Sequence, residues 1–256
     1  MQSRPTPLPS LRAGSSRYPR SGSSSSVASD GTQGYDYSVR FDCCAALSAD
    51  GRFAAFLSQA SNLVPGGVSG IDLYVRDRQA GTTERIAVDA FGAAISANGR
   101  FVAFSSSGAV LVYDRSTGVT RRADVRSDGG QADGGVYEYE EPVISANGRF
   151  VAFKSGVANL VAGDTNDRED VFVHDRQTGK TTRVNLGPNG RQANSGSDSG
   201  APALSADGRY VAFTSYDSNL VRGDTNGTPD IFVHDRQLGE TTRVSVGLKN
   251  RQGRHQ

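Results

Sequence analysis

Residues 204–213 read Leu-Ser-Ala-Asp-Gly-Arg-Tyr-Val-Ala-Phe, and close copies of this segment recur three more times along the chain. The other copies begin at Leu47, Ile95 and Ile144. Successive copies lie 48, 49 and 60 residues apart, counted between the turn glycines Gly51, Gly99, Gly148 and Gly208. Periods of this length are typical of stacked repeats, in which each unit is one small supersecondary element.

Two further blocks follow each copy and complete the unit. The second block reads Asp-Ile-Phe-Val-His-Asp-Arg in the last unit, and the equivalent blocks begin at Asp72, Val110, Asp170 and Asp230. The third block occupies Thr82 to Val88, Val119 to Val125, Thr181 to Leu186 and Thr241 to Val246. Asp-Gly or Asn-Gly is predicted to supply the two positive-φ residues of a tight hairpin turn, and Asp-Arg-x-x-Gly predicts a type I turn closed by a left-handed glycine.

The blocks between these turns predict short strands. Phe101-Val-Ala-Phe104 is apolar on both alternating faces, so we expect a middle strand that is buried on both sides. Thr181-Thr-Arg-Val184 mixes polar and apolar residues, as an outer strand does. Each unit is therefore predicted to be a four-stranded antiparallel sheet. Because one such sheet cannot bury both of its faces, stacking around an axis predicts a β-propeller.

Over residues 40–246 the repeat resembles that of the TolB-like (PD40, WD40-like) propeller family. The resemblance is carried by two motifs, Ser-Ala-Asp-Gly-Arg-Tyr-Val-Ala-Phe and the Asp-Ile-Phe-Val-His-Asp-Arg that follows it. Ala stands before Asp-Gly or Asn-Gly in all four copies, where the family usually has Pro, and the turn argument is unaffected. The resemblance implies an all-β propeller that binds proteins or ligands, in some members attached to a peptidase. Such propellers are typically six-bladed, so four units predict either an open or partial ring or a narrow closed one.

The predicted organisation has three parts. Residues 1–35 form a leader rich in Ser, Pro and Arg that we expect to be disordered, because it has little apolar surface to bury. Residues 36–248 hold the propeller, and residues 249–256 form a flexible tail. The four blades are expected at about 43–88, 89–125, 140–186 and 200–246. Connectors ending in Gln33, Gln131 and Gln192 precede the first, third and fourth blades.

Composition excludes several partners and leaves the compartment open. The 28 basic and 27 acidic residues nearly cancel, which gives no electrostatic reason to expect nucleic acid. No apolar run approaches the roughly 18 residues of a spanning helix, so no membrane span is expected. The adjacent Cys43 and Cys44 are expected to be small strand residues, with an intermolecular disulfide as the alternative. The resemblance leans towards a periplasmic or secreted protein, although no signal peptide is visible.

The candidate site lies in the long loops between the two middle strands of the third and fourth blades. Each loop places oxygen-bearing side chains at its first, third and seventh positions, an alternation that suits a Ca²⁺ ion. The alternative is an Asx turn whose side chains hold the loop. The candidate ligands are Asp164, Asn166 and Asp170 in one loop and Asp224, Asn226 and Asp230 in the other.

Function is predicted to be binding without catalysis, through a protein partner or through self-association at the rim or at an exposed blade face. His174 and His234 share one repeat position with Arg76 and Tyr113, which indicates a partly exposed structural position. The alternative is the propeller of an enzyme: a gating domain of the prolyl-oligopeptidase kind without its catalytic domain, or a glycosidase or lyase. Paired carboxylates for a glycosidase are offered by Glu138, Glu140 and Glu141.

Overall fold

The computed structural model describes residues 26–35, 45–66, 70–133, 141–195 and 201–247 and contains four separate four-stranded sheets. All pairings within the sheets are antiparallel, and the strands of each sheet follow chain order from the inner to the outer strand. The prediction of an all-β propeller built from four antiparallel units is confirmed. The strands of the first and second sheets are β1 (Ala45–Leu47), β2 (Phe53–Ser58), β3 (Asp72–Asp77), β4 (Thr82–Ala87), β5 (Phe91–Ile95), β6 (Phe101–Ser106), β7 (Ala109–Asp114) and β8 (Val119–Arg122).

The third and fourth sheets repeat this order. A single 3₁₀ turn, η1 (Pro188–Gly190), lies in the connector between them. The remaining strands are β9 (Val143–Ile144), β10 (Phe150–Ser155), β11 (Asp170–Asp175), β12 (Lys180–Arg183), β13 (Ala203–Leu204), β14 (Tyr210–Ser215), β15 (Asp230–Asp235) and β16 (Glu240–Arg243).

The inner turn of each sheet explains the Ser-Ala-Asp/Asn-Gly-Arg motif. In the first sheet, Ser48 Oγ donates to Asp50 and accepts a 2.9 Å hydrogen bond from the backbone N–H of Phe53. The backbone N–H of Gly51 donates to the carbonyl of Ser48, and the φ of Gly51 is +68°. The residue before the glycine is outside the positive-φ region, so the prediction of positive φ at both turn positions is wrong. The serine side chain holds a longer turn that needs a left-handed glycine only.

A bidentate ion pair ties each inner turn to the end of the third strand. In the third sheet, Arg149 Nε and Nη2 donate to Asp175 at 2.8 and 2.7 Å. The same Asp175 also accepts the backbone N–H of Gln177 at the start of the outer turn. The pair occurs in all four sheets as Arg52–Asp77, Arg100–Asp114, Arg149–Asp175 and Arg209–Asp235. This recurrence supports an architectural role for these charges.

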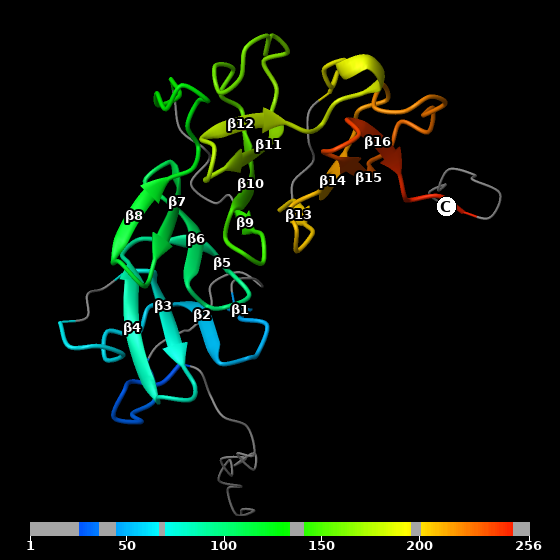
Figure 1. Cartoon of the computed structure of the whole chain (residues 1–256). Coiled ribbons are helices and arrows are strands. Elements are labelled where there is room, and N and C mark those ends of the chain that lie inside the picture. The colour runs from blue at the N-terminus through cyan, green and yellow to red at the C-terminus, as the bar shows by residue number, and fades with distance from the viewer. Residues whose placement is uncertain (1–25, 36–44, 67–69, 134–140, 196–200, 248–256) are drawn as a thin grey trace, which may run out of the picture.

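The sheets follow one another along an open arc, and their faces pack in sequence (Figure 1). We call the face turned to the next sheet the leading face and the opposite face the trailing face. One apolar cluster joins Val112 on the leading face of the second sheet to Phe153 and Phe172 on the trailing face of the third. Equivalent clusters join the first sheet to the second and the third to the fourth. Burial of both middle strands, predicted for Phe101–Phe104, thus comes from neighbouring sheets.

A second contact between sheets repeats at every junction. Phe101, at the start of β6, lies so close to Gly148 of the next sheet that a Cβ built on this glycine would be 2.1 Å from the ring. Arg176 of the third sheet lies over the same ring, with its guanidinium carbon 4.3 Å from the centroid. The other junctions repeat both contacts, with Phe53 against Gly99 and Arg115 and with Phe150 against Gly208 and Arg236.

Backbone hydrogen bonds complete the junctions. The N–H of Ala97 donates to the carbonyl of Ala146 at 2.9 Å. The same bond runs from Ala49 to Ala97 and from Ala146 to Ala206. The alanine that replaces the usual proline of the resembled family therefore supplies an N–H that proline lacks.

The connectors form small clasps on the sheets that follow them. Isolated bridges pair Val27 with Gln33, Val125 with Gln131 and Leu186 with Gln192. Because residues 26–35 form the first of these clasps, the prediction that the whole of residues 1–35 is disordered is wrong for its last part. Residues 1–25, the tail at 249–256 and both cysteines lie outside the described residues.

Candidate functional site

The long loop of the third sheet brings its three predicted ligands together around an arginine. Arg183, on the outer strand β12, places Nη1 2.9 Å from Asp164 Oδ1 and 2.9 Å from Asp170 Oδ2. Asn166 Nδ2 lies 3.3 Å from both carboxylate oxygens of Asp170 and 3.2 Å from the carbonyl of Ala193. A guanidinium therefore supplies positive charge at the point where the carboxylates meet.

The fourth sheet repeats the arrangement with its own arginine. Arg243 Nη1 lies 3.2 Å from Asp224 Oδ1 and 3.3 Å from Asp230 Oδ2. Asn226 Nδ2 donates to Asp230 at 3.1 Å, and the hydroxyl of Ser245 donates to the same carboxylate. Both loops therefore use an aspartate at the start of the third strand, an asparagine four residues earlier and an arginine on the outer strand.

Asn166 and Asn226 also behave as Asx-turn residues. Asn166 Oδ1 accepts the backbone N–H of Arg168 at 3.2 Å, and Asn226 Oδ1 accepts that of Thr228 at the same distance. These bonds are the ones expected of the structural alternative, in which the side chains hold the loop. They leave the amide Nδ2 of each asparagine, a donor, directed at the carboxylate.

The Ca²⁺ prediction stays a prediction for both loops. Burial and the charge of Asp170 raise the pKa of Asp164, and the guanidinium of Arg183 opposes that rise. Asp164 Oδ1 is buried and has no hydrogen bond with good geometry among the described residues. Within the described part of the chain, no group of three or more His, Cys, Asp or Glu side chains is placed to hold a metal ion.

The two strand histidines are buried and not partly exposed. His174 and His234 are each 5% exposed, so the prediction of a half-exposed strand position is wrong. His174 Nδ1 lies 2.9 Å from Thr181 Oγ1, and this hydroxyl donates to the carbonyl of Val125 in the connector. The connector buries the histidine, a tertiary effect that the local sequence does not show. Burial lowers the pKa of both histidines.

A groove that the sequence did not reveal lies between the third and fourth sheets. It has a volume of about 290 Å³. Asp175 is its acidic lining residue and is paired with Arg149. The lining residues are Asp175, Lys180, Thr182, Arg183, Val184, His234 and Arg236.

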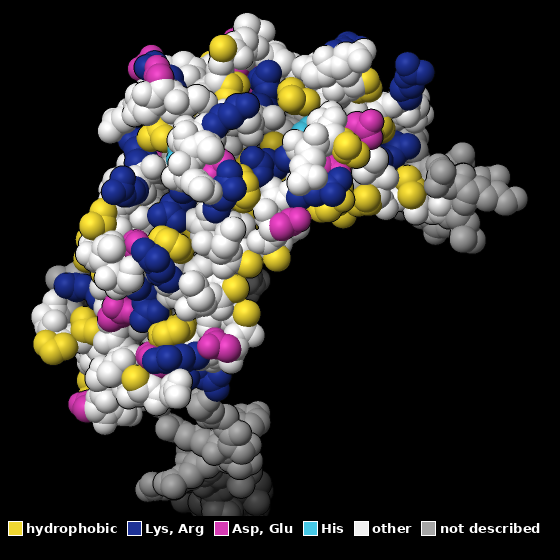
Figure 2. Space-filling model, in the orientation of Figure 1, with side chains coloured by type: hydrophobic (Ala, Val, Ile, Leu, Met, Phe, Trp, Pro, Cys, Tyr) yellow, Lys and Arg dark blue, Asp and Glu magenta, His cyan; other side chains and the backbone are white. Residues whose placement is uncertain are grey.

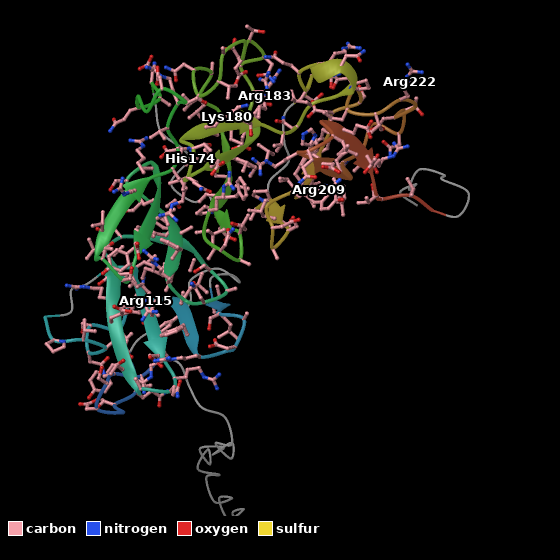
Figure 3. All side chains as sticks on the ribbon, viewed as in Figure 1. Arg115, His174, Lys180, Arg183, Arg209 and Arg222 are labelled. Atoms are coloured by element: carbon pink, nitrogen blue, oxygen red, sulfur yellow. The ribbon has the colours of Figure 1, made fainter. Side chains whose placement is uncertain are left out.

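Positive charge collects around this groove. Lys180 is exposed, and Arg236 is half-buried over Phe150 with its Nε lacking a hydrogen-bond partner among the described residues. Burial lowers the pKa of Arg236. Figure 3 labels Lys180 and Arg183 on the third sheet, and Figure 2 shows Lys and Arg side chains spread along this face of the arc. The groove is suited to a ligand that carries carboxylates.

Two further predictions concern the acidic connector before the third sheet and the absence of a membrane span. Glu138 and Glu140 lie outside them, and Glu141 is half-buried, so the glycosidase alternative is untested. No described helix has the length and apolarity needed to cross a membrane.

Comparison with known proteins gives similarity of structure alone. No family model matches the chain, and no curated protein matches it. TolB from Agrobacterium tumefaciens is 16% identical over 77% of this chain and 62% of its own, with a TM-score of 0.48. The β-propeller domain of the Trilobed protease from Pyrococcus furiosus, described as having an open velcro topology, is 9% identical over 79% of this chain and 56% of its own, with a TM-score of 0.47.

A peptidase gives a similar result. Dipeptidyl peptidase 4 from Porphyromonas gingivalis is 11% identical over 77% of this chain and 31% of its own, with a TM-score of 0.48. The chain thus spans less than two thirds of the length of each of these three proteins. The assignment of the four sheets as propeller blades rests on the repeat motif, strand order, register and junction contacts given above.

Proposed function

We propose that the chain is a binding scaffold without catalytic activity of its own, and that the groove between the third and fourth sheets takes an acidic segment of a partner protein. The observation that carries this proposal is the charge of the groove. Lys180 and Arg236 contribute positive charge, whereas the carboxylate of Asp175 is already neutralised by Arg149. Arg183 is likewise paired, with Asp164 and Asp170, so it orients the loop and adds little net attraction.

Lys180 is the side chain through which the proposal is tested. It begins the outer strand β12, opposite Asp175, and the equivalent position of the fourth sheet is Glu240, opposite Asp235. Lys180→Glu therefore installs a residue that the same repeat position already holds in the neighbouring sheet. We expect the variant to fold normally while the charge at the groove is reversed.

The matched control is Arg222→Glu. Arg222 is exposed on the long loop of the fourth sheet and lines a separate pocket with Asn189 and Ser218 (Figure 3). The two variants change the net charge of the protein equally, so a general electrostatic effect would move both. Only a local effect at the groove separates them.

The experiment measures binding of a fluorescein-labelled hexaglutamate peptide by fluorescence anisotropy at low salt. We expect the wild type and Arg222→Glu to bind with the same Kd, and Lys180→Glu to bind about tenfold more weakly, since each tenfold change corresponds to about 1.4 kcal/mol. Added salt should weaken binding, because it screens exposed charges. Equal affinities of the two variants would remove the groove as the binding site.

A further inference from the structure

The leading face of the fourth sheet has the same apolar surface that the other three sheets bury. Ile231 is 46% exposed, whereas Val171 at the equivalent position of the third sheet is fully buried. Val244 is 48% exposed, and its equivalent Val184 is 1% exposed. Figure 1 shows that no described element covers this side of β13–β16. The face is thus one half of a blade junction.

The other elements of a junction are present on the same face. Tyr210 is 41% exposed and stands where the preceding sheets place Phe53, Phe101 and Phe150. The guanidinium of Arg209 lies over the Tyr210 ring at 4.9 Å, as the preceding arginine does over the ring in each of the other sheets. Among the described residues, no second arginine lies over Tyr210 in the way that Arg176 lies over Phe101. The backbone N–H of Ala206 has no described acceptor, although Ala49, Ala97 and Ala146 each donate to the next sheet.

The first sheet presents the complementary half. The carbonyl of Ala49 has no described donor, whereas the carbonyls of Ala97, Ala146 and Ala206 each accept from the sheet before. Among the described residues, a Cβ on Gly51 would meet nothing closer than Arg78 at 3.7 Å, so none of them takes the place that an aromatic ring fills at Gly99. Leu47 is 60% exposed, whereas Ile95 at the same position of the second sheet is 9% exposed.

Loop residues of the first sheet cover the outer part of its trailing face, and equivalent loop residues are part of an internal junction. Phe56 and Tyr74 are buried against Ala60 and Leu63 of their own loop. In the third sheet, the equivalent loop residues Val157 and Leu160 belong to the cluster around Phe153 and Phe172, and the second sheet still packs there.

We propose that two copies of this chain associate head to tail, with the leading face of the fourth sheet of one copy on the trailing face of the first sheet of the other. Tyr210 would take the position of Phe101 at an internal junction, against Gly51 and Arg78 of the second copy. The N–H of Ala206 would donate to the carbonyl of Ala49. The contact is heterologous, because two different surfaces meet. This inference does not rest on the acidic-segment proposal.

Charge does not oppose the contact. Arg209 is paired with Asp235 at 2.6 Å, and Arg243 is paired with Asp230 at 3.3 Å, so the charged side chains around the apolar patch are compensated within the sheet. Docking would therefore bury Ile231 and Val244 without leaving one of these charges alone in the interface.

The test uses one variant for each half of the contact. Ile231→Glu places a charge on the leading face of the fourth sheet, and Leu47→Glu places one on the trailing face of the first. We expect the full-length wild type to show a mass that rises with concentration to at least twice that of one chain in analytical ultracentrifugation. Each variant alone should stay monomeric, because a buried unpaired charge is costly.

Mixing the two variants gives the decisive result. Ile231→Glu retains an intact first sheet and Leu47→Glu retains an intact fourth sheet, so an equimolar mixture should form a dimer that grows no further. Val119→Glu, on the exposed outer strand β8, is the control and should associate like the wild type. Circular dichroism checks that every variant is folded.

Three outcomes overturn the proposal: a wild type that is monomeric at all concentrations, variants that associate like the wild type, or a mixture of the two variants that stays monomeric. A variant that associates on its own like the wild type would indicate a symmetric contact between like faces or an association elsewhere on the molecule. A peptide-binding defect at Lys180 would leave all three results unchanged, so failure of this proposal is distinguishable from failure of the groove proposal.

Discussion

The guanidinium of Arg176 lies over the ring of Phe101 with 4.3 Å between its carbon and the ring centroid, although the two residues belong to different sheets. The same ring also fills the space beside Gly148. One aromatic side chain thus connects the middle strand of one blade to the inner turn and the outer turn of the next. This contact, repeated at three junctions, makes the stack of sheets a single structure.

Phe101→Ala should therefore weaken the whole stack. We expect the free energy of unfolding to fall by about 2–3 kcal/mol, since the ring is partly buried and both of its partners lose contacts. Tyr210→Ala, the same change at the exposed end, should cost under about 1 kcal/mol in dilute protein. Chemical denaturation of both variants at one low concentration measures the difference, and equal losses would argue against the junction.

The junction bond made by alanine is open to a direct test. Ala97→Pro removes the N–H that donates to Ala146, whereas Ala206→Pro removes one with no described acceptor. Because the resembled family usually has proline here, the turn should accept both. We expect Ala97→Pro to lose about 1 kcal/mol relative to Ala206→Pro, the net value of one hydrogen bond. Thermal unfolding curves that coincide would count against this bond.

The sequence repeats predicted the sheets, the turns and the long loops, because those features depend on local chemistry that recurs in every copy. They did not predict the contact between Phe101 and Gly148, since it joins residues of different units. The burial of His174 was also missed, because it depends on a connector that bonds to Thr181. The role of Ala97 was hidden for a similar reason, since its partner lies in the next unit.

The candidate loops show the same limit. Spacing alone placed Asp164, Asn166 and Asp170 together, and they are together. Arg183, which lies between the two carboxylates, belongs to another strand of the sheet, and its contribution could not be read from the loop. A search for Asx residues followed by an arginine on the outer strand would have indicated it.

Arg183→Gln tests whether arginine or a metal ion holds this loop. Breaking a buried ion pair leaves an uncompensated charge, so we expect the free energy of unfolding to fall by about 3–5 kcal/mol in buffer without Ca²⁺. If the vacated position suits a hard cation, Ca²⁺ at ten times its Kd should return about 1.4 kcal/mol to the variant. The wild type should gain nothing.

The outcome of this calcium titration separates the two interpretations of the loops. A wild-type protein whose melting temperature rises with Ca²⁺ would support the metal site predicted from the sequence, and would contradict the arginine account. Lys154→Gln, which also removes a cation from a buried ion pair in the third sheet, is the control for a general loss of charge. It should show no response to Ca²⁺.

Acid should destabilise the protein through its buried histidines. Burial lowers the pKa of His174 and His234 below the ordinary value of 6.5, so the unfolded chain binds protons that the folded chain does not. The histidines' contribution to stability is then fully present above the unfolded pKa and is lost as the pH falls below about 6.5 through the lowered folded-state pKa. Replacing both residues with Gln should flatten the dependence of the unfolding free energy on pH in this window. An unchanged slope would exclude the histidines as its cause.

The central claim, that neighbouring sheets pack through an aromatic ring against a turn glycine, is tested most directly by comparing Gly148→Ala with Gly51→Ala. Both glycines have positive φ, +73° and +68°, so both variants pay a backbone cost of about 1 kcal/mol. A Cβ at position 148 would also meet Phe101 at 2.1 Å, whereas one at position 51 would meet, of the residues that the structure describes, only Arg78 at 3.7 Å. Unfolding in denaturant should therefore show that Gly148→Ala is less stable than Gly51→Ala by about 1–3 kcal/mol. Equal losses in the two variants would contradict the stacked-blade account.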